Sequence, residues 1–164
     1  METKLSKKDI WNLLELVHDP EIPVLSVVDL GVVRDVIMGD EGVEILITPT
    51  YSGCPAMNMI ETEIKILMSE HHVPAKVKLI LSPAWTTDWM SEKGKQKLKA
   101  YGIAPPQDET ISLNTLFGKP HQVICPLCNS HHTELISQFG STACKSLYKC
   151  LDCLEPFDYF KCLK

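Results

Sequence analysis

Hydrophobic residues in the first part of the chain follow two different spacings. After Ser6, with Asp9 three residues later as a capping box, apolar residues recur at the i, i+3, i+4, i+7 positions of a helix. We expect this helix to stop at Asp19-Pro20, because the residue before a proline is pushed out of the α region. Its apolar face consists of Ile10, Leu13, Leu14 and Val17.

Extended and helical segments then alternate. The β-branched runs VVDLGVVRDVIM (27–38) and VEILITP (43–49) are joined by GDEG (39–42), which predicts a hairpin. A second helix is expected from Pro55 to about Ser69, with Met57, Ile60, Ile64, Leu67 and Met68 on its apolar face. KVKLILS (76–82) predicts a third strand, and Thr86 or Thr87 can cap a last helix to about Tyr101-Gly102. The order α-β-β-α-β-α predicts an α+β fold, a small mixed sheet with helices on one face.

The cysteine content changes sharply along the chain. One of the seven cysteines occurs before Leu116, whereas the other six follow Lys119. The charge changes as well: residues 1–118 contain 11 basic and 17 acidic side chains, and residues 119–164 contain 5 and 4. With FGKP (117–120) as a turn, we expect an α+β domain over residues 1–117 and a small C-terminal domain over residues 118–164.

Four cysteines of the C-terminal part have the spacing of a metal site. Cys125 and Cys128 form one CxxC motif, and Cys150 and Cys153 form a second one, separated from the first by 21 residues. This spacing is typical of a zinc ribbon, in which four thiolates bind one tetrahedral ion. So short a segment cannot bury enough apolar surface to fold alone, so we expect a structural zinc ion. A four-thiolate site has no open position for catalysis.

Other residues of this part leave alternatives open. Cys144 could replace one of the four ligands, and four thiolates would also suit an iron–sulfur cluster. His131 and His132 are expected on an exposed hairpin turn rather than on a metal. Cys162 and His121 are the other metal-binding residue types of this part.

Composition and charge narrow the function classes. The N-terminus lacks the pattern of a signal peptide, and no window approaches the roughly 18 apolar residues of a membrane span, so we expect a cytoplasmic protein without membrane contact. Seven cysteines in that reducing compartment suit metal ligands or reactive thiols better than disulfides. A net charge of −5 disfavours nucleic acid as a partner, and the ribbon half lacks interleaved basic and aromatic residues.

Cys54 is the one cysteine outside the C-terminal part, in the stretch TYSGCPAM (50–57). If Pro55 is the first helical residue, the thiol lies beside the N-cap, where free backbone N–H groups and the positive end of the helix dipole favour the thiolate. Such a cysteine suits nucleophilic or metal-transfer chemistry. The alternative is a small buried hydrophobic residue between a strand and a helix.

Several motifs resemble a known family. HDPEIPVLSVVDLGVV (18–33) and TPTYSGCPAM (48–57) resemble the iron–sulfur-assembly domain family that includes SufT-like proteins, with its Asp-Pro-Glu turn, Asp-Leu-Gly strand and Cys-Pro at the helix start. SPAWTTDWMSEKGKQKL (82–98), YGIAPP (101–106) and the cysteine-rich terminus resemble its PaaD-like branch, which serves bacterial phenylacetyl-CoA epoxidase systems. The resemblance covers nearly the whole chain.

The resemblance implies an accessory protein of aerobic phenylacetate catabolism that matures or repairs the iron–sulfur cluster of the epoxidase machinery. Its partners would be the epoxidase components, especially the iron–sulfur reductase subunit. Cys54 falls on the family's reactive cysteine and would bind iron or a cluster transiently. Asp19, Glu21 and Asp29 would flank it, although all three also suit turns and caps.

Two further hypotheses remain beside the maturation role. The chain could be a structural subunit that holds the epoxidase components together through its ribbon, or the ribbon could bind nucleic acid. We expect no substrate turnover by the chain itself, even if it bears the name of the enzyme complex that it serves. Trp85 and Trp89 are expected in the core or at a docking surface. The sequence leaves the oligomeric state open.

Overall fold

The computed structural model describes residues 5–107 and 122–161. The chain divides into two compact units, Met1–Gly94 and Lys95–Lys164, each with its own sheet. The predicted boundary between residues 117 and 118, with its FGKP turn, lies outside the described residues and stays a prediction. No helix within the described ranges is long and apolar enough to cross a membrane.

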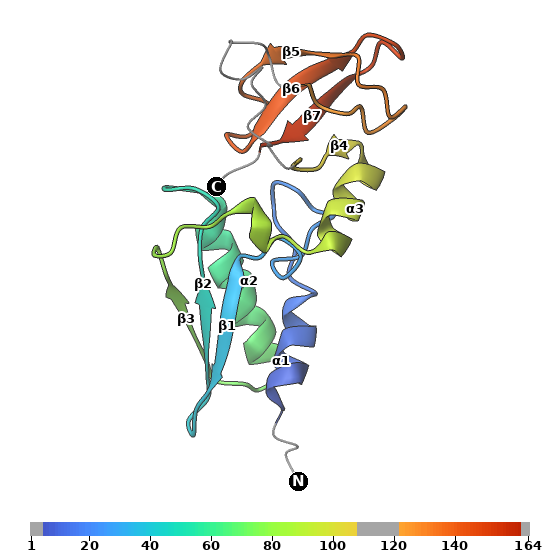
Figure 1. The fold of residues 1–164 in the computed structure, drawn as a ribbon. Helices are drawn as coiled ribbons and strands as arrows, with labels where there is room; N and C mark the ends of the chain where they lie inside the picture. The colour runs from blue at the N-terminus through green and yellow to red at the C-terminus, as the bar shows by residue number, and fades with distance from the viewer. Residues whose placement is uncertain (1–4, 108–121, 162–164) are drawn as a thin grey trace. The chain divides into compact units, whose positions relative to one another are not determined.

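The first unit contains a three-stranded mixed sheet in the order β1-β2-β3 (Figure 1). Strands β1 (Val33–Met38) and β2 (Val43–Ile47) are antiparallel and joined by the predicted hairpin, whose turn is closed by the Gly39 N–H donating to the Gly42 carbonyl at 2.8 Å. β3 (Ala75–Leu79) is parallel to β2, so α2 (Ala56–Glu70) is the crossover between them. The predicted α+β class with a small mixed sheet is confirmed.

Helices α1 (Lys7–Leu14) and α2 cover one face of this sheet, with α1 against β1 and α2 against β3 (Figure 1). Alternate strand residues point to that face, because successive side chains of a strand point to opposite sides. The main buried side chains between the layers are Ile10, Leu14, Val36, Ile45, Ile47, Met57, Ile60, Ile64 and Met68. Most of the two predicted apolar faces therefore form this core. Leu13 and Leu67 are only half-buried, and the buried Val17 lies beyond the end of α1.

The N-terminus of α1 agrees with the prediction, but its C-terminus does not. Ser6 caps the helix through the predicted capping box with Asp9. The helix ends at Leu14 rather than near Asp19 because the following chain pairs elsewhere: the Val27 N–H donates to the Val17 carbonyl, and His18 forms a bridge with Ser26.

Residues 27–32 were expected in a strand, which is wrong. They form a tight turn, in which the Leu30 N–H donates to the Ser26 carbonyl at 3.0 Å. The Asp29 N–H donates to the Ser26 hydroxyl, and the Ser26 N–H donates to the Asp29 carboxylate. This reciprocal pair is a Ser-x-x-Asp capping box, and it outweighs the extended preference of the flanking valines.

The last helix of the first pattern begins later than predicted. Thr86 starts only a 3₁₀ turn, η1 (Thr87–Trp89), and Met90 returns to extended backbone. Helix α3 (Glu92–Tyr101) begins after Ser91, whose hydroxyl accepts the Gly94 N–H at 2.9 Å. A serine cap therefore starts this helix in place of the predicted threonine.

The second unit contains a four-stranded sheet in the order β4-β7-β6-β5. Its strands are β4 (Ile103–Ala104), β5 (Thr133–Ser137), β6 (Lys145–Cys150) and β7 (Pro156–Phe160). β5, β6 and β7 form an antiparallel meander, whereas β4 pairs in parallel with β7. The segment around Ile103 therefore belongs to the ribbon sheet.

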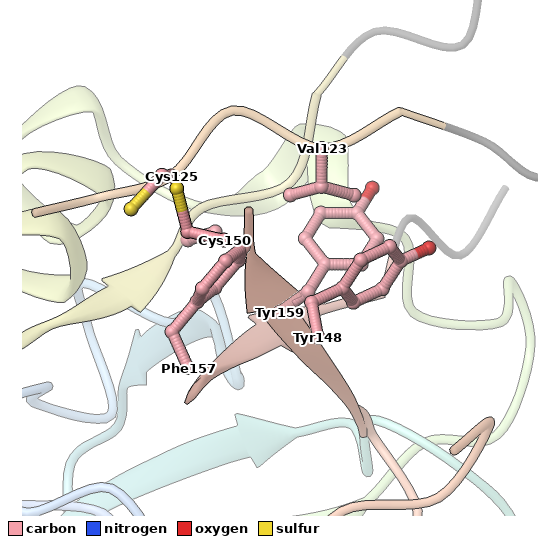
Figure 2. Close-up of a cluster of buried hydrophobic side chains, with 7 residues drawn as sticks. Val123, Cys125, Tyr148, Cys150, Phe157 and Tyr159 are labelled. Carbon is pink, nitrogen blue, oxygen red and sulfur yellow. The ribbon is translucent and has the colours of Figure 1, made fainter. Parts of the chain in front are cut away.

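A small core fills the second unit. It consists of Ala104, Val123, Cys125, Tyr148, Cys150, Phe157 and Tyr159. Figure 2 shows the rings of Tyr148, Phe157 and Tyr159 together, with the Cys125 and Cys150 sulfurs at one end of the cluster. Two of the predicted metal ligands are thus part of the core itself.

Candidate metal centre and the Cys54 loop

Each CxxC motif lies in a tight turn of the same design. In the first turn, the Cys125 N–H donates to the Ser130 carbonyl, and in the second the Cys150 N–H donates to the Glu155 carbonyl. The residue after each second cysteine is left-handed, Asn129 with φ 61° and Leu154 with φ 66°. These turns direct both sulfur atoms of a motif to the same side of the chain.

The four sulfur atoms of Cys125, Cys128, Cys150 and Cys153 all lie within 4.8 Å of one another. The Cys125 and Cys153 sulfurs are 3.8 Å apart, and those of Cys128 and Cys150 are 3.5 Å apart. A tetrahedral ion with Zn–S bonds of about 2.3 Å requires sulfurs about 3.8 Å apart. The donor set and its spacing therefore fit one zinc ion.

The thiols of this cluster differ in acidity. The N–H of Cys153, which lies 3.5 Å from the Cys150 sulfur, lowers the pKa of Cys150 to about 6. The Glu155 N–H favours the Cys153 thiolate, but desolvation and the neighbouring thiols outweigh it and raise the pKa of Cys153 to about 12. A bound cation would favour the thiolate form of these sulfurs.

Polar side chains connect the two turns. Asp152 accepts a hydrogen bond from the Ser130 hydroxyl, and the His132 Nδ1 lies 3.3 Å from the other oxygen of that carboxylate. These contacts, Ser130 first, lower the pKa of the Asp152 carboxyl. His131 and His132 are both exposed and are absent from the four-sulfur group.

Cys144 is buried away from the cluster. Its sulfur lies 3.0 Å from the Thr142 hydroxyl, and among the residues that the structure describes, the metal-ligand group contains the four CxxC cysteines without it. The structure therefore does not bring Cys144 into the predicted site. Cys162 and His121 lie outside the described residues.

Cys54 lies in the loop between β2 and α2, as predicted, and is half-buried. Gly53 before it is left-handed, with φ 75°, and the Cys54 carbonyl accepts the Met57 N–H at 3.3 Å. The N-cap of α2 is Pro55, which provides no side-chain hydrogen bond, and the first turn of α2 contains no acidic residue. The first turn of α2 itself therefore provides no carboxylate to offset the positive end of the helix dipole.

Two of the acids expected near Cys54 have structural contacts. Asp19 accepts the N–H groups of Glu21 and Ile22, each at 2.8 Å. Asp29 accepts a hydrogen bond from the Ser91 hydroxyl at 3.0 Å in addition to its turn with Ser26. Both carboxylates are buried and stabilise turns, and their place beside Cys54 stays a prediction.

The two tryptophans of the Ser82–Leu98 motif also have structural contacts. Trp85 is buried and donates its indole N–H to the Leu30 carbonyl at 2.9 Å. Trp89 is half-buried beneath the Arg34 guanidinium, 3.4 Å from its ring centre. Trp85 therefore lies in the core, one of the two places expected for it.

A cavity of about 720 Å³ lies at the other end of α2, lined by the β1-β2 turn and by His71, His72 and Pro74. The 15 residues of α2 span about 22 Å, so the cavity is separate from the Cys54 loop. It forms no metal-ligand group among the described residues.

Comparisons with known proteins match both parts of the chain. The family model described as "Iron-sulfur cluster assembly protein" matches residues 7–77, and the one described as "PaaD zinc beta ribbon domain" matches residues 109–161. An Escherichia coli protein, named as a putative subunit of 1,2-phenylacetyl-CoA epoxidase, is 51% identical over 94% of this chain and 92% of its own length.

Shorter relatives are similar to part of the chain. A Porphyromonas gingivalis "Fe-S protein maturation auxiliary factor" is 35% identical over 57% of this chain and 90% of its own length. A solved structure of a domain of unknown function from Bacillus anthracis, 30% identical, covers 56% of this chain and 90% of its own, with a TM-score of 0.53. Because the E. coli relative matches nearly all of both chains and the C-terminal part matches the PaaD ribbon model, this chain belongs to the PaaD family.

Proposed function

We propose that this chain is a cytoplasmic accessory protein of aerobic phenylacetate catabolism that matures or repairs an iron–sulfur cluster of the phenylacetyl-CoA epoxidase system. The client is the iron–sulfur reductase subunit. The observation that carries the proposal is the similarity over nearly the whole chain to a protein named as a putative component of this epoxidase. Relatives named as Fe–S protein maturation auxiliary factors support the assembly role.

In this proposal Cys54 is a transient ligand for iron or a cluster in transit to the client. Its half-buried position lets a partner approach the sulfur, and it lies directly before Pro55, the N-cap of α2. A single protein thiol holds iron weakly, because stable iron–sulfur sites use several protein ligands. Weak binding suits a carrier that must release its cargo.

The four clustered cysteines would hold zinc with a structural role. Cys125, Cys128, Cys150 and Cys153 provide four soft sulfur ligands at a spacing that fits a tetrahedral ion. Zinc bound there would connect the two turns and complete a small core. Because four thiolates fill its coordination, this ion would activate no substrate.

The maturation role is tested in cells that make the epoxidase components with either the wild-type protein or Cys54→Ala. We expect the reductase subunit purified from the Cys54→Ala cells to contain several-fold less iron and sulfide. Ser52→Ala, an exposed neighbour in the same loop, is the matched control and should leave loading unchanged. Equal loading with Cys54→Ala, at matched expression and zinc content, would overturn the role of this thiol.

A scaffolding role is the second candidate, favoured by the word "subunit" in the name of the E. coli relative. It predicts stable co-purification with the oxygenase components under gentle conditions, and loss of that association when the ribbon loses its metal. Dissociation of the wild-type protein during gentle purification would argue against it, whereas the maturation role requires only a transient contact.

A further inference from the structure

Strand β3 lies at one edge of the three-stranded sheet of the first unit. In the order β1-β2-β3, β3 pairs only with β2 among the described residues (Figure 1). The Val43 N–H donates to the Pro74 carbonyl, and the Ile80 N–H donates to the Ile47 carbonyl. The backbone N–H and C=O groups of the even-numbered residues of β3 therefore point towards β2. By the alternation of a parallel ladder, the backbone N–H and C=O groups of Val77 and Leu79 point away from the sheet.

The two outer strands of the sheet differ as templates for another strand. β1 is interrupted by a register shift between Val33 and Asp35, and a bulge of this kind blunts an edge. The register of β3 with β2 is regular from Ala75 to Leu79, and pairing continues to Ile80. β3 therefore offers the more regular row of backbone groups.

The side chains along β3 separate into a basic and an apolar row. Lys76 and Lys78 are exposed and alternate with Ala75, Val77 and Leu79, whose strand partners Val43, Ile45 and Ile47 are buried. The lysines therefore lie on the sheet face away from the helices. On the other side of the sheet, Leu79 is 50% exposed, and Leu81, two residues beyond the end of β3, is 66% exposed.

This charge pattern decides between two occupants of the edge. In a symmetric antiparallel pair with a second copy, centred on Val77, Lys76 would lie opposite Lys78. Like charges directly opposite each other destabilise a strand pair, so the edge disfavours self-association. A strand with acidic residues opposite the lysines would instead gain opposite-charge pairs, and its intervening apolar residues would cover Leu79 and Leu81.

We propose that the β3 edge, residues 75–81, binds an extended segment of a partner protein in which acidic and apolar residues alternate. The segment adds a fourth strand to the sheet. Backbone hydrogen bonds to Val77 and Leu79 supply the affinity, and the two lysines select the acidic sequence. The proposal goes beyond cluster maturation and requires neither Cys54 nor the zinc site.

The test uses the full-length zinc-loaded protein and a capped synthetic nonapeptide in which valine and glutamate alternate. Amide hydrogen exchange is followed by NMR with and without the peptide. We expect the amides of Val77 and Leu79 to gain at least tenfold protection, whereas Lys76 and Lys78, already hydrogen-bonded to β2, change little. Protection elsewhere in the chain, or none at all, would overturn the proposal.

A charge exchange tests the role of the lysines. The double variant Lys76→Glu/Lys78→Glu should bind the glutamate peptide at least tenfold more weakly and should bind a matched valine–lysine peptide that the wild type rejects. Lys8→Glu/Lys99→Glu, at two exposed helix positions with the same change in net charge, should retain the wild-type preference. If both double variants lose the preference equally, net charge decides binding and the proposal is wrong. Dimerisation through β3 in sedimentation would also contradict it.

Discussion

Two glycines with nearly the same φ angle lie in different surroundings. Gly31 has φ 74°, and a Cβ atom there would be 2.3 Å from the Trp89 carbonyl oxygen. Gly53, beside Cys54, has φ 75° but open space around the same position. The glycine of the Asp-Leu-Gly motif is therefore required for close packing of two backbones, whereas Gly53 provides only loop conformation.

We expect Gly53→Ala to lower the free energy of unfolding by about 1 to 2 kcal/mol, the cost of an alanine in the left-handed conformation. Gly31→Ala should lower it by well over this amount. The excess arises from the clash with Trp89. Urea denaturation of the two zinc-loaded variants measures the difference directly. Equal losses of stability would show that the clash is relieved at no cost.

The four CxxC cysteines give a second prediction at this scale. Cys128→Ser should abolish stoichiometric zinc binding, because the ion would lose one of four thiolates at an exposed corner of the cluster. Cys54→Ser is the control and should retain the full zinc content. Metal analysis of the purified proteins measures the zinc content of the two variants. Retention of zinc by Cys128→Ser would imply another ligand.

Among the elements, the capping box of α1 has a predictable pH dependence. Hydrogen bonds from the Ser6 side chain and backbone lower the pKa of Asp9. Since the folded pKa is below the unfolded one, the stabilisation is present above the unfolded pKa and is lost as the pH falls through the folded value. The capping box therefore stabilises α1 at neutral pH and loses this stabilising effect at acidic pH.

An NMR titration of the Asp9 carboxyl group tests this prediction. The wild-type pKa should lie below that of a free aspartate, and Ser6→Ala should return it towards the ordinary value. An unchanged Asp9 pKa in Ser6→Ala would mean that the hydrogen bond from the Ser6 hydroxyl is not its cause.

The sequence predicted elements well where one local signal dominates. The capping box at Ser6, the glycine-bounded hairpin and the apolar face of α2 all agree with the structure. The turn at residues 27–32 was missed because its valines outweighed the Ser26-x-x-Asp29 signal, which was present in the sequence. The parallel pairing of β4 with β7 joins residues more than 50 positions apart, for which local patterns contain no information.

The candidate sites could likewise be predicted where a local sequence signal is strong. Both CxxC motifs could be identified because each is local and their combination is specific, and the structure brings all four sulfurs together. The role of Cys54 depended on family resemblance, because a lone cysteine beside a helix N-terminus has no comparable spacing signal. The open edge of β3 could not be predicted, since it depends on which strands pair.

On the scale of the whole molecule, each of the two units has its own core, and among the described residues the candidate zinc-binding cysteines belong to the core of the second. We expect removal of zinc by a strong chelator to abolish the dispersed NMR signals of residues 122–161 while those of residues 5–94 persist. Readdition of zinc should restore the spectrum. Loss of both sets of signals together, or of neither, would contradict a ribbon that depends on metal.

The central claim is that Cys54 transfers iron or a cluster to a client. The most direct measurement is the rate of [2Fe–2S] formation in the cluster-free reductase subunit, supplied with ferrous iron, sulfide and a thiol reductant, and followed by visible absorption. The account predicts that the zinc-loaded wild-type protein accelerates cluster formation and that Cys54→Ser, with the same zinc content, does not. Equal acceleration by both proteins, or by neither, would contradict it.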